Sequence, residues 1–300
     1  MQDIEIEGLT YDLSTTDNTA TVKRMPTFTD KHYSGDIVVP ATVEYGKKTY
    51  TVTAVGDNTF SNSVYNRVTS VALPNTITAI GKSAFEGAEI ETIEMPNVIS
   101  IGERAFYACH KLKSITLNNS LTKIEKEAFN ATGLTSIVIP NSVTSIGASA
   151  FAQCTSLESV TLGNNVETIG NGAFSISWVR SITLPNSVKA IGSYAFSNSQ
   201  LNTLNLNNGL EIIGEGAFNQ CRLTFVDIPK SVTSIGEKAF YGLTSLSSVS
   251  VHWETPLDIN PNTFNFGYSA SLNTLKGTYN LYNTSNGWRL FAEITDILLD

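Results

Sequence analysis

Three cysteines and three histidines are the side chains of this chain best suited to bind a metal ion or to act as a nucleophile or a base. The histidines are His32, His110 and His252, and none has a second histidine or a cysteine at the spacing of a metal site. We interpret them as surface or turn residues. The sequence therefore predicts no bound metal.

The cysteines occupy one recurring place in the sequence. Cys109, Cys154 and Cys221 each follow a phenylalanine by three residues, where other segments have small side chains such as Ala88 or Ser177. This spacing predicts an inward-facing column in which free thiols behave as small hydrophobic groups. A disulfide needs Cα atoms within about 7 Å, and these cysteines are two or three repeats apart, so we expect no bridge.

Motifs of nucleophilic enzymes, nucleotide-binding loops and zinc proteases do not occur in the chain. The patterns G-x-S-x-G, G-x-x-x-x-G-K-S/T and H-E-x-x-H are all missing. Acidic pairs such as Glu125 and Glu127 are typical of a solvated outer turn. The sequence therefore predicts a protein that is not an enzyme and that uses no cofactor.

The charge balance disfavours two classes of partner. Nineteen Lys and Arg residues against 27 Asp and Glu residues give a net charge of −8. No basic stripe is visible that would bind nucleic acid or an anionic membrane. No run approaches 18 consecutive apolar residues, so we expect no membrane insertion by this segment. The first seven residues lack the layout of a signal peptide, so we expect a cytoplasmic protein or an export signal missing from this chain.

A recurring phenylalanine is the main signal of organisation. Ten of them follow one another at intervals of 21 to 25 residues, and five residues before each lies Val or Ile. Gly follows that Val or Ile in eight of the ten cases, Glu125 and Asn260 being the exceptions. Self-similarity at such a period is the signature of a solenoid. The ten are Phe60, Phe85, Phe106, Phe129, Phe151, Phe174, Phe196, Phe218, Phe240 and Phe264.

One unit, residues 134–151, shows the apolar skeleton L-x-x-I-x-I-P-N-x-V-x-x-I-G-x-x-A-F. Residues 137–139 are β-branched and alternate, which predicts a short strand. Pro140 and Asn141 predict the turn that ends this strand. Strands that recur in the same direction in each unit must form a parallel sheet.

The second half of the unit must return the chain to the next strand. Val143 and Ile146 form a further inward-facing pair, and Gly147 suits a bend with positive φ. We expect Ala150 and Phe151 to lie on a short helical or 3₁₀ turn on the return side. The predicted fold class is therefore α/β, a solenoid with a parallel β-sheet face and short helical return turns.

Stacking of the units lets each apolar side chain contact its counterparts above and below, which one unit alone cannot do. We predict a single solenoid domain over residues 1–300, with a β cap at 1–53, repeats of about 22–23 residues at 54–264 and a C-terminal cap at 265–300. Residues 43–52 read as a hairpin within the first cap. Open ends would expose core and strand edges, so atypical caps are expected. The aromatic side chains of the second cap are Tyr268, Tyr279, Tyr282, Trp288 and Phe291.

Asparagine recurs two positions after the last apolar residue of each predicted strand. Such a column can form hydrogen bonds between neighbouring turns and satisfy backbone groups at a buried bend. We interpret it as structural. Its members are Asn75, Asn97, Asn119, Asn141, Asn164, Asn186 and Asn208.

The repeat unit resembles the BspA-type leucine-rich repeat of bacterial and protozoan surface proteins. The resemblance covers residues 55–264, and residues 35–40 of the first cap are in keeping with it. It implies a leucine-rich-repeat solenoid. It also implies an extracellular or cell-surface protein that binds host or partner macromolecules.

The third and fifth positions of each predicted strand point away from the core. They form two outer columns that consist mainly of serine and threonine and carry almost no charge. Phe225 is the large apolar exception, with Asp227, Asn205 and His252 as its expected neighbours. The third positions are Ser70, Thr92, Ser114, Ser136, Ser159, Ser181, Thr203, Phe225 and Ser248. The fifth positions are Ala72, Glu94, Thr116, Val138, Thr161, Thr183, Asn205, Asp227 and Ser250.

Exposed aromatic side chains often anchor protein contacts, so Phe225, Asp227, Asn205 and His252 are the candidate binding residues. The leading hypothesis is an adhesion scaffold that binds a protein or an extracellular-matrix partner along its elongated surface. One alternative is a glycan-binding surface protein, which the Phe225 neighbourhood would serve. The other is a structural spacer that assembles with copies of itself.

Overall fold

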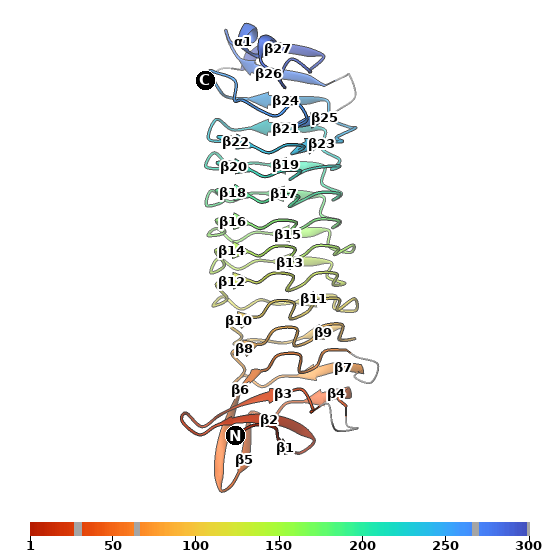
Figure 1. Cartoon of the computed structure of the whole chain (residues 1–300), viewed down its shortest axis with the longest axis vertical. Coiled ribbons are helices and arrows are strands. Elements are labelled where there is room, and N and C mark those ends of the chain that lie inside the picture. Colours follow the sequence, from red (N-terminus) through yellow and green to blue (C-terminus); the bar gives the residue numbers. More distant parts are fainter. Residues whose placement is uncertain (27–31, 63–66, 266–269, 299–300) are drawn as a thin grey trace.

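The structure, a computed structural model, describes residues 1–26, 32–62, 67–265 and 270–298. The chain forms a long rod in which one coil is stacked on the next, from the N-terminal cap to the C-terminal cap (Figure 1). Tyr268, which we assigned to the C-terminal aromatic cluster, lies outside the described residues. The stacked coils confirm the predicted solenoid.

A row of parallel strands, here called the strand face, runs along the rod and uses the predicted strand of each coil. These strands are hydrogen-bonded in pairs, with a group of four toward the C-terminal cap. Partners in register are one repeat apart, as Ser136 is with Ser159 and Ile137 with Val160. Residues 136–138 form the strand of the unit described above, one residue earlier than predicted. The strands are β4 (Ser34–Val38), β7 (Arg67–Ala72), β9 (Thr92–Ile93), β11 (Ser114–Ile115), β13 (Ser136–Val138), β15 (Ser159–Thr161), β17 (Ser181–Thr183), β19 (Thr203–Asn205), β21 (Phe225–Ile228), β24 (Ser248–Val251), β26 (Ser271–Leu275) and β27 (Glu293–Leu298).

A second row of parallel strands, which we did not predict and which we call the second sheet, lies on another side of the coils; its hydrogen bonding is interrupted once, between Ile101 and Lys123. Each of its strands ends on the buried Val or Ile that lies five residues before the repeat phenylalanine, and Ile146 lies opposite Ile169. The strands are β6 (Lys48–Val55), β8 (Ala79–Ile80), β10 (Ser100–Ile101), β12 (Lys123–Ile124), β14 (Ser145–Ile146), β16 (Thr168–Ile169), β18 (Ala190–Ile191), β20 (Ile212–Ile213) and β22 (Ser234–Ile235). A short parallel pair, β23 (Phe240–Tyr241) and β25 (Phe264–Asn265), follows near the C-terminal cap.

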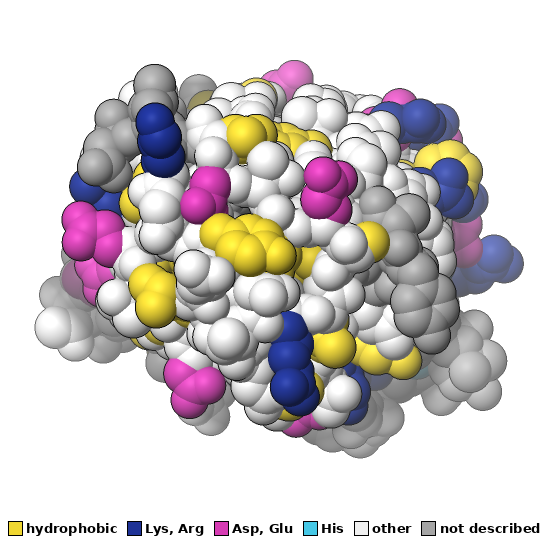
Figure 2. Space-filling model, turned by 90° about the horizontal axis from the view of Figure 1, so that it is seen from above, with side chains coloured by type: hydrophobic (Ala, Val, Ile, Leu, Met, Phe, Trp, Pro, Cys, Tyr) yellow, Lys and Arg dark blue, Asp and Glu magenta, His cyan; other side chains and the backbone are white. Residues whose placement is uncertain are grey.

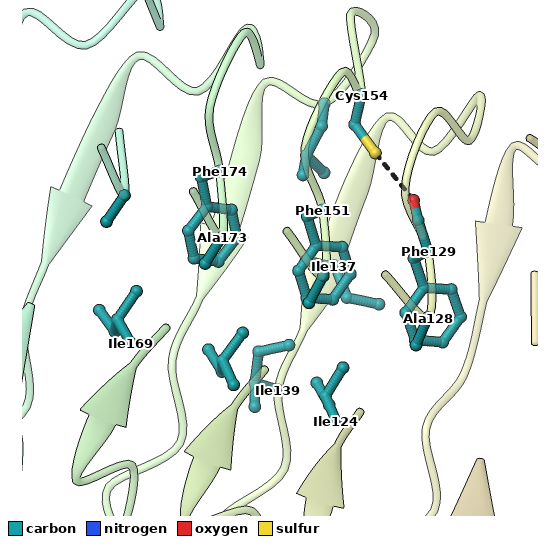
Figure 3. Close-up of a cluster of buried hydrophobic side chains, with 14 of the residues drawn as sticks. Ile124, Ala128, Phe129, Ile137, Ile139, Phe151, Cys154, Ile169, Ala173 and Phe174 are labelled. Atoms are coloured by element: carbon teal, nitrogen blue, oxygen red, sulfur yellow. Dashed lines mark hydrogen bonds between the residues drawn. The ribbon is translucent and has the colours of Figure 1, made fainter. Parts of the chain in front are cut away.

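The repeat phenylalanines form a continuous stack through the core. From Phe85 to Phe264, neighbouring ring centroids are 5.1–5.6 Å apart and the ring planes lie within 13° of parallel. Figure 3 shows Phe129, Phe151 and Phe174 in this stack, beside the isoleucines of the same coils. The fixed offset in the sequence places equivalent rings above one another, so the whole ladder is buried.

The return segments are turns, and our expectation of helical or 3₁₀ turns there is wrong for the described residues. The N–H of Ala150 donates to the carbonyl of Gly147 at 3.2 Å, which closes one turn. The next N–H, of Phe151, donates instead to the carbonyl of Ala173 in the neighbouring coil, at 2.8 Å. A helix requires successive N–H groups to bond within the same segment, and this alternation prevents it. The one helix in the described part of the chain is α1 (Tyr279–Thr284), in the C-terminal cap.

Positive φ occurs two residues before and two residues after the repeat phenylalanine, and mostly at residues other than glycine. Around Phe151 these positions are Ser149 (φ 53°) and Gln153 (φ 59°). Gly147 itself has no positive φ, so our explanation of this glycine is wrong. A Cβ at Gly147 would lie 2.7 Å from the backbone carbon of Glu125 and from the backbone nitrogen of Lys126. The repeat glycine therefore allows two coils to approach closely.

The cysteine column faces inward as predicted. Cys109, Cys154 and Cys221 are buried free thiols, and each donates to the carbonyl of the repeat phenylalanine of the preceding coil, at 2.9–3.1 Å. Figure 3 shows the bond from Cys154 to Phe129. The thiol is thus a second donor to a carbonyl that also accepts a hydrogen bond from its own coil, as Phe129 does from the hydroxyl of Thr132 at 3.0 Å.

The asparagine column makes some of the predicted bonds between coils. The side chain of Asn97 donates to the carbonyl of Asn75 at 2.7 Å, and Asn141 accepts from the backbone N–H of Asn164 at 2.7 Å. These bonds tie one bend to the next along the rod.

Both caps differ from the repeats. In the first, β1 (Ile4–Ile6), β2 (Leu9–Ser14) and β3 (Thr19–Lys23) form an antiparallel meander, and β3 then pairs parallel to β6. The predicted hairpin is confirmed as β5 (Thr42–Tyr45) with β6, joined by Gly46 and Lys47, which both have positive φ. In the second cap, Tyr282 and Trp288 pack edge to face, and Trp288 also contacts Phe264. These aromatic side chains cover the end of the core ladder.

Candidate functional site

The outer columns of the strand face point to solvent along most of the rod, as the alternation predicted. From Thr92 to Asp227, every residue of both columns is exposed. The exception comes at β24, where Ser250 is buried and Ser248 is half-buried, so our outward assignment of Ser250 is wrong. The side chain of Asn273, from β26 of the C-terminal cap, donates to the Ser250 hydroxyl at 3.2 Å. The cap therefore ends the exposed part of the strand face.

Phe225 and Asp227 owe their positions to the period of two in β21. Val226 and Ile228 between and after them are fully buried, which directs Phe225 and Asp227 outward. The Phe225 side chain is 45% exposed even though it is one of the largest apolar groups on this face. The cap does not cover this ring.

His252 joins the same neighbourhood from the next coil. It directly follows β24, at the place that Pro229 takes after β21. Its Nε2 atom lies 2.7 Å from Oδ1 of Asp227, and the two side chains form an ion pair when the imidazole is protonated. The side chain of Asp227 remains 54% exposed, so the rest of its carboxylate faces solvent.

Two shallow hollows meet at Asp227. The larger, of about 470 Å³, lies toward the C-terminal cap and has both apolar and polar walls. The smaller, of about 290 Å³, lies on the strand face beside Phe225 and Asn205 and shares Asp227 and Leu206 with the first. The larger is lined by Leu206, Asn208, Asp227, Pro229, Lys230, Ser231, His252 and Leu275. The structure thus brings together all four residues that the sequence suggested.

Sequence reasoning missed several residues of this site. Lys230 stands in the asparagine column directly after Asn208, and this break in the column was a visible signal. Leu275 belongs to β26 in the cap, and no periodicity in the sequence places it beside Asp227. Asn205 was expected as a neighbour, and its amide donates to the hydroxyl of Thr183 at 3.1 Å.

The other residues that could take part in binding or chemistry lie apart from this neighbourhood or are packed within the fold. Trp253 is half-buried, its indole N–H donates to the carbonyl of Val232 at 3.0 Å, and its ring packs on Trp288. His32 and His110 are exposed. Burial raises the pKa of all three thiols, that of Cys221 to about 12, so they are protonated and inaccessible at neutral pH.

The described residues bring no three His, Cys, Asp or Glu side chains together in a way that could hold a metal ion. No described helix is long and apolar enough to cross a membrane. Figure 2 shows the molecule from above its C-terminal end, where apolar side chains lie among uncharged polar groups and scattered charges of both signs. The residues around Asp227 present hydrogen-bond donors, acceptors and apolar groups beside one another.

Comparisons with known proteins place the repeat in context. A sequence profile described as the BspA type leucine rich repeat region (6 copies) matches residues 47–134, 78–200 and 167–287. No match was found among curated proteins. The chain is similar to a leucine-rich repeat protein from Bacteroides ovatus ATCC 8483, with 30% identity and a TM-score of 0.76, over 98% of this chain and 76% of that one. A leucine-rich repeat protein from Eubacterium ventriosum ATCC 27560 is 22% identical with a TM-score of 0.50, over 97% and 77% of the two chains, and shows a likeness of fold alone.

Proposed function

The chain belongs to the BspA-type leucine-rich repeat family, and from this premise we propose that it is a non-catalytic binding scaffold, displayed on a cell surface or secreted. Its partner is a protein or a component of the extracellular matrix. Contact is made along the strand face, through many weak interactions spread over a long surface.

The observation that carries this proposal is the strand face itself. From Thr92 to Asp227 it is exposed, almost uncharged and built from short polar side chains on stacked parallel strands that pair in groups. A rigid surface of this kind loses little conformational entropy when a partner binds. Short side chains also allow a partner to approach the sheet closely over a broad area.

The thiols and the hollows of the molecule also support a non-catalytic binding function. The thiols are buried and protonated, and the hollows at Asp227 are shallow and open on one side. Family membership supports display outside the cell, where a long rigid rod can reach a partner.

The proposal is tested by placing bulk in the middle of the strand face. Thr161 and Thr183 are exposed neighbours in the fifth-position column, so Thr161→Arg and Thr183→Arg obstruct the face without touching the core. Thr155→Arg is the matched control, because Thr155 is exposed on the segment after the repeat phenylalanine. We expect binding to an array of matrix proteins to fall at least tenfold in the two face variants and to be unchanged in the control.

Two results would contradict the proposal. If the control and the face variants lose binding equally, the strand face is not the contact surface. If the unmodified chain binds nothing on the array but associates with itself as its concentration rises in sedimentation, the self-assembling spacer is the better description.

A further inference from the structure

The regular repeat is interrupted at four neighbouring positions near the C-terminal cap. Phe225 replaces the Ser or Thr of the third-position column, and Asp227 is one of two acids in the fifth-position column. Lys230 replaces the recurring asparagine, and His252 stands where many coils have proline. Coil stacking requires none of these side chains, since the other coils fold without them.

From this cluster we infer that the two hollows around Asp227 form a binding site for a neutral saccharide. The inference deepens the proposed binding function and rests on it. The larger hollow, of about 470 Å³, falls within the usual size range of small-ligand sites. The smaller one adjoins it at Leu206 and Asp227, and the two together are here called the trough.

The walls of the trough match a ligand that is rich in hydroxyl groups. A sugar presents adjacent hydroxyls that both donate and accept hydrogen bonds, and one apolar face of C–H groups. Asp227 supplies acceptors, Lys230 supplies donors, and Asn205 and Asn208 supply both. The half-exposed ring of Phe225 provides a flat apolar surface next to these polar groups.

The aspartate is held in place before any ligand arrives. His252 contacts Oδ1 of Asp227 at 2.7 Å, which restrains the carboxylate while more than half of that side chain stays exposed. Preorganised polar groups lose less entropy on binding. The cap supplies a further wall through Leu275, so the trough lies at the step between the strand face and the cap.

Ser231, a residue that lines the larger hollow, lacks the hydrogen bond that its repeat position normally makes. Ser142 and Ser187 occupy the same place in earlier coils, and each donates to a carbonyl of the preceding coil at 2.6 Å. The hydroxyl oxygen of Ser231 is buried and has no hydrogen-bond partner among the described residues. A buried polar atom without a partner is costly and is often satisfied by a ligand or by water.

Other ligand classes fit the trough less well. A peptide that adds a strand needs a free sheet edge, and β21 has neighbours on both sides. A polyanion would meet the Asp227 carboxylate and a net charge of −8. A metal ion would need further acidic, histidine or cysteine ligands close to Asp227 and His252, and the described residues supply none.

The test compares site variants with matched variants elsewhere on the same face. Phe225→Ala and Asp227→Asn alter the trough. Val138→Ala removes another exposed apolar side chain of the outer columns, and Glu94→Gln removes the other acid of the fifth-position column, at a separate hollow. All four changes are at exposed positions, and urea unfolding verifies that each variant folds.

The full chain is applied to an array of neutral oligosaccharides, acidic oligosaccharides and matrix proteins, and hits are titrated by calorimetry. We expect binding to a neutral oligosaccharide that weakens about tenfold or more in Phe225→Ala and in Asp227→Asn and less than about twofold in the two controls. Binding to matrix proteins with no binding to any neutral oligosaccharide would overturn the saccharide site and leave the proposed scaffold function standing. Binding to acidic oligosaccharides alone, lost in Lys230→Ala but kept in Phe225→Ala, would also overturn it.

Discussion

The rings of Phe151 and Phe174 stack inside the rod with centroids 5.3 Å apart and planes 4° from parallel. Strands of adjacent coils are about 4.8 Å apart, so this centroid distance follows from the stacking of the coils. Both rings are fully buried, and each also contacts the ring of the coil on its other side. Every interior phenylalanine therefore supports two neighbours, and the loss of one ring leaves a gap in a continuous column.

Phe151→Ala should destabilise the fold by about 3–5 kcal/mol, because it removes a buried ring and leaves a cavity between two coils. Phe225→Ala should cost less than about 0.5 kcal/mol, because that ring is 45% exposed on the strand face. The measurement is the free energy of unfolding in urea for both variants. A loss at Phe225 as large as the loss at Phe151 would show that the outward assignment of Phe225 is wrong.

Gly147→Ala should destabilise the fold by about 2 kcal/mol or more, since a Cβ there would lie 2.7 Å from the backbone of the preceding coil. Backbone atoms of a stacked coil cannot move aside without disturbing the sheet. Gly209→Ala is the control, because its Cβ would first meet the flexible end of Lys189, at 3.1 Å. Thermal unfolding of the two variants provides the comparison, and equal losses would show that close approach is not why the glycine recurs.

The fold was largely predictable because identical residues stack on identical residues. The offset between Ile146 and Phe151 is the same in every coil. Stacked coils therefore place each isoleucine and each phenylalanine above its counterpart, which forms continuous ladders of side chains. The second sheet was not predicted because its strands after β6 have only two residues and lack a run of alternating side chains. The conformation of the return turns was not predicted because residues other than glycine, such as Gln153, occupy the positions with positive φ. Only a glycine would have indicated positive φ in the sequence.

Part of the candidate site was predictable because the alternation of side chains along a strand decides which of them face outward. Alternation along β21 places Phe225 and Asp227 outward without knowledge of any neighbouring coil. The wall formed by Leu275 depends on how the C-terminal cap packs, and the cap has no repeat from which packing can be derived. Lys230 could have been identified from the sequence, because it is a lysine at a position where most coils have asparagine.

Ile176 should be a point where stability can be gained. It has a φ of 57°, which is strained for a β-branched side chain, and it is 49% exposed, so its removal costs little burial. We expect Ile176→Gly to raise the free energy of unfolding by about 1 kcal/mol. Ala131→Gly at the same repeat position is the matched control and should gain less, because alanine is not β-branched. A loss of stability in Ile176→Gly would indicate that the exposed side chain makes contacts that outweigh the strain.

The cysteines should be unreactive until the rod unfolds. Burial raises the pKa of each thiol, that of Cys221 to about 12, and all three lie within the core. At pH 8 a thiol-specific reagent such as dithiobis(nitrobenzoate) should label none of them in the native protein and all three in urea. Rapid labelling of a single cysteine under native conditions would reveal local opening of that coil.

Glu86 should make stability depend on pH in the acidic range. Burial is the largest single influence and raises the pKa of Glu86. The hydrogen bonds from Arg104, at 2.7 Å, and from Ser83 outweigh it together with the positive charges of Arg104 and Lys82, so the pKa lies below its ordinary value of 4.5. A carboxyl with a lowered folded pKa contributes stability above its unfolded pKa and loses that contribution as the pH falls through the folded pKa.

Glu86→Gln should therefore be less stable than the unmodified chain at pH 7, by up to about 0.5 kcal/mol because both side chains of the pair are about one-third exposed. Below the folded pKa the two proteins should have the same stability, since Glu86 is then protonated. Urea unfolding between pH 2.5 and pH 7 measures this difference. Glu91→Gln is the control, because Glu91 pairs with Lys113 at 3.4 Å and both side chains are about two-thirds exposed, so screening by solvent should leave a smaller difference. A difference for Glu86→Gln that stays constant across the whole pH range would show that the Arg104 bond does not depend on the charge of Glu86.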